Sequence, residues 1–138
     1  MIELTDEMRD ALASALTDHA PVIVAYTDTA GQPQISFRGS AQVLSGDQLA
    51  FWARNPQGGV LAAIPTNPKM SFLYRNPATR VAWQFQGRAR IDSSDATRAQ
   101  VFDNSPELER NQDPERKGVA VVIDVDRVIQ RGQAIMER

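Results

Sequence analysis

The chain has 138 residues, 42% hydrophobic and 23% charged, with a formal net charge of −2, which fits one folded domain over residues 1–138. The near-neutral charge argues against binding to nucleic acid or to an anionic membrane surface. The absence of cysteine excludes disulfides, thiolate nucleophiles, zinc–thiolate sites and iron–sulfur clusters.

The first expected element is a helix that begins after Thr5 and ends near Asp18. Thr5 can cap this helix, Asp6 and Glu7 suit the positive end of its dipole, and apolar residues recur at helical spacing. Because acids come early and no basic segment precedes an apolar block, the N-terminus does not resemble a secretory signal. No apolar run approaches the roughly 20 residues that span a bilayer, so a cytoplasmic protein without a membrane partner is expected.

After this helix the hydrophobic pattern changes to a period of two, which is typical of strands. The segments expected as strands are 22–26, 35–44, 49–54, 70–74, 79–91 and 119–125, with 128–129 as a possible extension. Short helices are expected over 60–64 and from Ser93 or Ser94 to about Asp103, and the polar segment 105–117 is expected to be a loop or a surface helix. Six strands joined mostly by tight turns favour a mainly β, α+β fold: a closed or nearly closed antiparallel β-barrel.

Two of these strands alternate clearly. In segment 35–44 one face carries Ile35, Phe37, Gly39, Ala41 and Val43, and the other carries Ser36, Arg38, Ser40 and Gln42. Segment 79–91 is longer than an average strand, so it is expected to bend at Gly87.

The sequence contains no set of residues typical of acid–base, nucleophilic or metal-assisted catalysis. Its single histidine, His19, follows the first helix, where the dipole favours it, and no pair of histidines has ligand spacing. No nucleophile-elbow, dinucleotide-binding or Walker A pattern is present. An enzyme of this sequence would need an organic cofactor to supply the reactive group, and we expect no catalytic side chain and no metal site.

Two arginines and a pair of glycines indicate a site for an anion. Arg54 ends one strand and precedes Gln57, Gly58 and Gly59, where a short helix with free backbone N–H groups begins. Together with Arg38 on the preceding strand, its forked guanidinium matches a phosphomonoester. A two-residue turn between the strands would put the arginines on opposite faces, whereas a bulge or a three-residue loop would bring them together. Alternatively, both arginines pair with surface acids and the glycines only form a loop.

The order of these segments resembles the pyridoxamine 5′-phosphate oxidase-like, FMN-binding split-barrel proteins. The resemblance lies in TDTAGQPQISFRGS, LAFWARNPQGG, TNPKMSFLYRNP and VAWQFQGRARID, and it covers residues from about 5 to 130. It implies a six-stranded antiparallel split barrel that forms a homodimer, with FMN bound between the subunits. The cofactor-binding residues that it implies are Arg38, Gly39, Ser40, Trp52, Ala53, Arg54, Gln57, Gly58 and Gly59, with Trp83 and Gln84 on the wall that faces the partner's site.

The two tryptophans in this set also have a simpler interpretation. Trp83 lies on the apolar face of its strand, which favours core packing, and Trp52 fits packing and ligand contact about equally.

The sequence departs from the pyridoxamine phosphate oxidases themselves in two places. Their phosphate turn carries Ser-Arg-Lys where this chain has Gln57-Gly58-Gly59, and the residues before Arg138 hold neither their substrate-binding arginine nor their histidine. The resemblance therefore implies a flavoprotein oxidoreductase that transfers hydride between FMN and a small molecule other than pyridoxamine phosphate. An F420-dependent reductase and a non-catalytic dimer that binds flavin or another small ligand are the alternatives.

Overall fold

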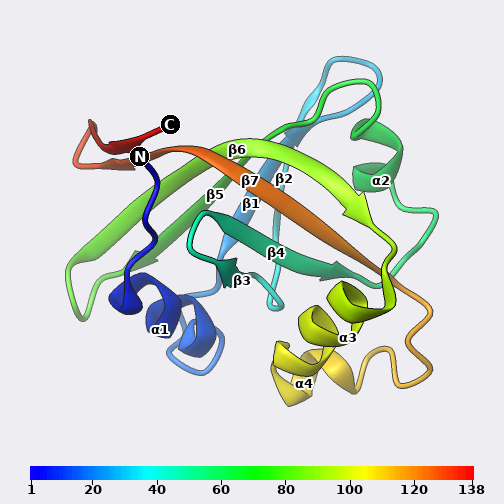
Figure 1. Cartoon of the computed structure of the whole chain (residues 1–138). Coiled ribbons are helices and arrows are strands. Elements are labelled where there is room, and N and C mark those ends of the chain that lie inside the picture. The colour runs from blue at the N-terminus through cyan, green and yellow to red at the C-terminus, as the bar shows by residue number, and fades with distance from the viewer.

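The computed structural model describes residues 1–138 as one large sheet with four short helices around it (Figure 1). The helices are α1 (Asp6–Ser14), α2 (Gly59–Ala63), α3 (Asp95–Asn104) and α4 (Glu107–Arg110). The strands are β1 (Ile23–Thr27), β2 (Pro33–Phe37), β3 (Gln42–Ser45), β4 (Gln48–Ala53), β5 (Lys69–Asn76), β6 (Val81–Asp92), β7 (Val119–Gln130) and β8 (Gln133–Glu137). The mainly β architecture with short helices agrees with the prediction, although the sheet has eight strands and not six.

All strand pairs are antiparallel, and the order across the sheet is β2-β1-β5-β6-β7-β4-β3, with β8 added to β7. The two ends of this order, β2 and β3, are consecutive in the sequence and are joined by residues 38–41. The sheet therefore curls until its two edges are linked by a short connection, but the edge strands do not pair with each other. This arrangement is a barrel with a split between β2 and the β3–β4 hairpin.

Two hydrophobic cores lie on opposite sides of β4. The larger core fills the inside of the barrel, and α1 closes it with Met8 and Leu12. The smaller core consists of Ala50, Trp52, Val101, Phe102 and Ala120, and it lies between β4, β7 and α3. Because β4 is covered on both faces, it is a rigid element on which a site can be built.

Capping residues in the sequence predicted the starts of α1 and α3 correctly. The side chain of Thr5 accepts a hydrogen bond from the Met8 amide, and Ser94 caps α3 in the same way through Thr97. The first helix ends at Ser14 and not near Asp18; beyond Ser14 the chain continues in turns. None of the four helices combines the length and apolar character needed to cross a membrane.

The long strand β6 has an irregularity at Gly87, the position where a bend was expected. Its register against β7 shifts between Gln86 and Gly87. A Cβ atom at Gly87 would lie 2.2 Å from the carbonyl oxygen of Asp124, so only glycine permits this close approach of the two strands.

Two strand predictions need correction. Segment 35–44 is not one strand: it breaks at residues 38–41, and its halves lie on opposite edges of the sheet. The sequence also predicted no strand after residue 129, yet β8 folds back on β7. The turn between them places Arg131 and Gly132 at φ values of 52° and 77°, which is typical of a tight hairpin turn.

Candidate functional site

The polar face of β2 points into the protein and its apolar face points outward. Ile35 and Phe37 are 74% and 66% exposed, whereas Ser36 and Arg38 are partly buried. Ser36 pairs with Val24, a fully buried residue of β1, so the two side chains share the inner face of the barrel. The alternation then directs Arg38 inward as well.

The guanidinium of Arg38 is a partly desolvated cation at the split of the barrel. Its Cζ atom lies 5.0 Å from the centre of the Phe51 ring, and its Nε atom is buried without a hydrogen-bond partner. Burial lowers the pKa of Arg38; Tyr26 and Glu109 raise it, and Arg54 lowers it further. A partly buried cation with unused donors is a group that can bind an anion.

The hairpin β3–β4 contains a β-bulge. Gln42 pairs with Ala50, and the register shifts between Val43 and Ser45. The structure therefore contains a bulge where an irregularity was expected, although the register of the hairpin does not extend to Arg38 or Arg54.

Ser40, in the turn before β3, contacts β4 through its side chain. The hydroxyl of Ser40 accepts a hydrogen bond from the Trp52 amide (2.9 Å) and donates one to the Trp52 carbonyl (3.2 Å), so its side chain replaces a strand partner. Residues 39 and 40 form a turn in which the Ala41 amide donates to the Arg38 carbonyl at 3.2 Å, so the strand ends before Arg38, but Arg38 and Arg54 lie close enough for their charges to interact. Arg54 is exposed, and its Nη1 atom donates to the Gln112 side chain at 3.2 Å.

The two glycines after β4 begin helix α2 beside Tyr26. Gly58 is the N-cap residue, and no side chain caps this helix. A Cβ atom at Gly59 would lie 3.3 Å from the hydroxyl oxygen of Tyr26, so the phenol lies against the helix start. The Gln57 amide donates to the side chain of Asn55, and no cation lies in this turn.

The predicted residues Trp52 and Ala53 are buried by packing. They are 5% and 1% exposed. The Trp52 indole meets the Phe102 ring edge-on at 5.2 Å between centroids, and its Nε1 atom donates to Asp113 at 2.9 Å. The structure thus favours the packing interpretation of Trp52, while its backbone supports Ser40.

The predicted residues of β6 lie on different faces of the sheet. Trp83 is 2% exposed in the large core and stacks on Tyr74 at 5.5 Å between centroids, as the packing interpretation expects. Gln84 is partly buried and pairs with Leu73 and Ile129 on the opposite face of the strand. Neither residue joins the group around Arg38 within one subunit.

Three residues that were not predicted to belong to the site lie near Arg38. Ser36 shares its face, and the Ser36 hydroxyl is also buried without a partner. Tyr26 comes from β1, and Glu109 comes from α4. Only Ser36 could have been found from the sequence, since it lies two positions before Arg38 and therefore on the same face of the strand.

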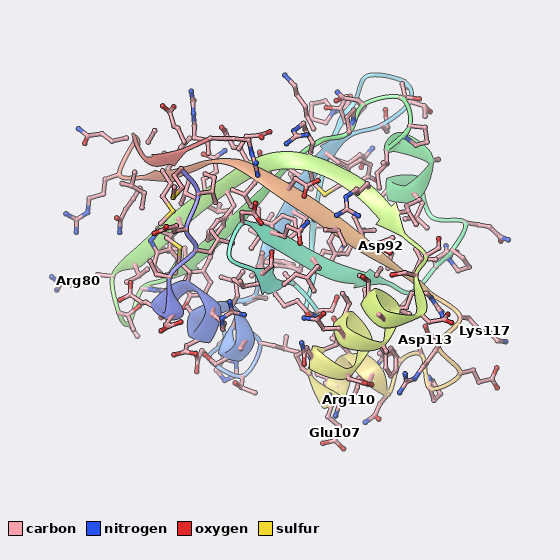
Figure 2. The ribbon with its side chains drawn as sticks, viewed as in Figure 1. Arg80, Asp92, Glu107, Arg110, Asp113 and Lys117 are labelled. Atoms are coloured by element: carbon pink, nitrogen blue, oxygen red, sulfur yellow. The ribbon has the colours of Figure 1, made fainter.

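Hydrogen bonds to Asp113 hold segment 105–118 against this end of the barrel. The carboxylate of Asp113, which is 8% exposed, accepts hydrogen bonds from the Trp52 indole and from the amides of Lys117 (3.0 Å) and Gly118 (2.9 Å). Burial raises the pKa of Asp113, but these donors outweigh burial and hold its pKa below the ordinary value. Figure 2 shows Asp113 and Lys117 beside α3, with Glu107 and Arg110 on α4 below them.

Solved structures with the same fold share little sequence with this chain. A protein related to general stress protein 26, of the pyridoxinephosphate oxidase family, from Clostridium acetobutylicum is 11% identical, with 94% of this chain and 95% of that chain covered and a TM-score of 0.65. An FMN-binding protein from Syntrophomonas wolfei is 8% identical, with 92% and 86% covered and a TM-score of 0.66. An F420 reductase is 17% identical, with 80% and 89% covered and a TM-score of 0.60.

No family model and no curated protein matches the sequence. The structural matches nevertheless confirm the resemblance at the level of the fold: the chain has the pyridoxamine 5′-phosphate oxidase-like fold.

Proposed function

We propose that residues 1–138 act as one domain that binds FMN at the split of the barrel and works in the cytoplasm as a homodimeric oxidoreductase. The reaction would be hydride transfer between the flavin and a small molecule other than pyridoxamine phosphate. The observation that carries this proposal is the partly buried Arg38 guanidinium, whose Nε atom is buried without a partner and whose charge interacts with that of Arg54. The fold supports it, because an FMN-binding protein and an F420 reductase share it.

The residues present fit the phosphate end of such a cofactor. Arg38 and Arg54 supply positive charge, and the unpartnered hydroxyl of Ser36 and the phenol of Tyr26 add hydrogen-bonding groups. A bound flavin would supply the hydride-transfer chemistry. The role of this chain is to hold the phosphate and, with the backbone of residues 38–40, to fix the position of the ring.

Titration of the purified protein with FMN tests the proposal, with Arg54→Ala as the diagnostic variant. The variant should bind FMN about tenfold more weakly, because one charge-assisted hydrogen bond is worth roughly 1.5–3 kcal/mol, and less at an exposed site. Its melting temperature should not change, since Arg54 is exposed and bonds only to Gln112. Quenching of flavin fluorescence gives the affinity. An affinity equal to that of the wild type would remove Arg54 from the site.

The same titration separates the alternatives. Binding of F420 in preference to FMN would favour the F420-dependent reductase. Tight binding of either cofactor without turnover, tested with NADPH and other donors, would favour a non-catalytic carrier.

An exposed apolar strip on the outside of the sheet supports the homodimer. Phe37 pairs with Ile23, and Ile23 pairs with Leu73, so these side chains form one row; Ile35 lies beside the row. Phe37, Leu73 and Ile35 are 66%, 43% and 74% exposed. Adjacent large apolar side chains on a sheet face are a typical contact surface for another protein, here a second copy of the chain.

A charge placed in this strip should prevent dimerisation. We expect the wild type to sediment as a dimer at micromolar concentration and Phe37→Glu to sediment as a monomer, because a carboxylate at the centre of an apolar interface would lose its hydration. Leu108→Glu is the matched control, since Leu108 is 63% exposed but lies on α4. A monomeric wild type would contradict the dimer and any site shared between subunits.

A further inference from the structure

Glu109 holds a carboxylate against the backbone of the proposed binding segment. A Cβ atom at Gly39 would lie 2.2 Å from Oε1 and 2.8 Å from Cδ of Glu109, so the carboxylate occupies the space that a side chain at Gly39 would need. Glu109 also lines one small cleft together with Ser40 and Arg54. This cleft has a volume of only about 10 Å³, room for roughly one water molecule. The carboxylate therefore occupies the space beside Gly39 and leaves little room next to Arg54.

The arginines do not hold Glu109 in this place. Its carboxylate makes no ion pair and no side-chain hydrogen bond, although its charge acts on Arg38. The position of Glu109 comes from its backbone, because α4 is only four residues long and both Arg110 and Asp113 hold it in place. Arg110, its last residue, donates to the carbonyls of Asp103 and Ser105 before the helix, and Asp113, just after the helix, accepts from the Trp52 indole. A carboxylate that is placed by the fold and has free oxygens can move away without breaking bonds of its own.

We propose that Glu109 stands in the free protein where the anionic group of a ligand binds, so that an anion reaches Arg38 only when this carboxylate moves away. Glu109 thereby determines the affinity and charge selectivity of the site: it disfavours a doubly charged phosphate more than a singly charged or neutral group. The identity of the ligand as a flavin rests on the proposed function, but competition between Glu109 and an anion does not.

The physical basis is that a carboxylate and a phosphate compete for the same guanidinium donors and repel each other. Arg38 and Arg54 carry two positive charges, and the negative charge of Glu109 lowers the net charge of the group to +1. A dianion bound with Glu109 still in place would add two negative charges to this group. The repulsion grows as the site loses water, because the effective dielectric constant falls.

The test compares Glu109→Gln with the wild type, with inorganic phosphate as the first probe. Glutamine keeps the shape of the side chain and removes its charge. We expect phosphate to bind Glu109→Gln roughly five- to tenfold more tightly, a change typical of removing one like charge from a partly exposed site. The rise in melting temperature with phosphate concentration measures this affinity. Glu107→Gln, on the same helix but exposed and directed away from the protein in Figure 2, should behave as the wild type.

Flavins provide the second probe. Glu109→Gln should bind FMN more tightly by a similar factor, whereas its affinity for riboflavin, which lacks the phosphate, should not change. Equal phosphate affinities in Glu109→Gln and the wild type, including no binding to either, would overturn the inference. If phosphate binds Glu109→Gln more tightly but FMN binds neither protein, the flavin proposal fails and the role of Glu109 stands.

Discussion

Replacement of Arg38 by methionine should weaken FMN binding about 100-fold, which corresponds to roughly 2.7 kcal/mol of binding free energy. Methionine keeps an unbranched apolar stem in contact with the Phe51 ring, but it removes the cation and every donor that faces the split. Quenching of flavin fluorescence measures the loss. Riboflavin should lose much less affinity than FMN, because the arginine is assigned to the phosphate.

The same substitution should leave the free energy of unfolding unchanged or raise it by about 1 kcal/mol. The buried Nε atom of Arg38 has no partner, and burial lowers the pKa of its guanidinium, so the folded protein bears a desolvation cost that methionine does not have. The lost contact between the cation and the Phe51 ring offsets part of this gain. Binding residues that cost stability are common at functional sites.

Urea unfolding and flavin titration of the same samples give both quantities. Arg75→Met is the matched control, since Arg75 is exposed on β5 and makes no ion pair or side-chain hydrogen bond, and it should change neither. If Arg38→Met destabilised the protein by several kcal/mol and bound FMN like the wild type, Arg38 would be a structural residue and the proposed site would be wrong.

The signals that predicted the fold correctly are those in which a few neighbouring residues decide the conformation. The cap at Thr5, the cap at Ser94 and the irregularity at Gly87 are of this kind. Strand β8 was not predicted, because its residues are mostly exposed and lack an apolar alternation. It forms because the turn at 131–132 returns the chain to β7, whose buried residues were visible in the sequence.

The alternation of segment 35–44 showed which residues share a face, but not which face is buried. A sheet that buries its apolar side would place Ile35 and Phe37 inside. Both are exposed, because β2 is an edge strand whose inner side faces the split with Ser36 and Arg38. The side that is buried depends on the whole barrel and, in our proposal, on a second subunit, and neither is encoded in the segment itself.

The group around Arg38 was only partly predictable for a similar reason. The two arginines were found because they are unusual in apolar strands, and in the structure they lie close enough for their charges to interact. Glu109 belongs to a polar segment with two prolines, and nothing in that segment points to Gly39. Its place is set by a contact between Trp52 and Asp113, which are 61 residues apart.

Removal of this contact should have the largest effect on stability. We expect Asp113→Ala to lower the free energy of unfolding by about 3 kcal/mol, because the Trp52 indole and the amides of Lys117 and Gly118 would lose a charged acceptor. Urea unfolding measures the change. Glu115→Ala should change stability by less than about 0.5 kcal/mol, because Glu115 is exposed and pairs only with the exposed Lys117.

A double-mutant cycle separates the indole from the two amides. Trp52→Phe should destabilise the Asp113→Ala variant less than it destabilises the wild type, since the indole donor then has no carboxylate to lose. If the two substitutions are additive, the hydrogen bond contributes nothing to stability.

The pH dependence of stability gives an independent measure of the same carboxylate. The pKa of Asp113 is lowered by folding, so its contribution is present above the pKa of the unfolded chain, about 4, and is lost as the pH falls through the lower pKa of the folded state. Asp113→Asn cannot titrate, and its stability should therefore fall less steeply below about pH 4 than that of the wild type. Asp126, whose pKa is lowered mainly by a hydrogen bond from Arg88, titrates in both proteins, so the difference between the two curves belongs to Asp113. Parallel curves would show that the three donors do not stabilise the charged form, and that segment 105–118, including Glu109, is held in place by other contacts.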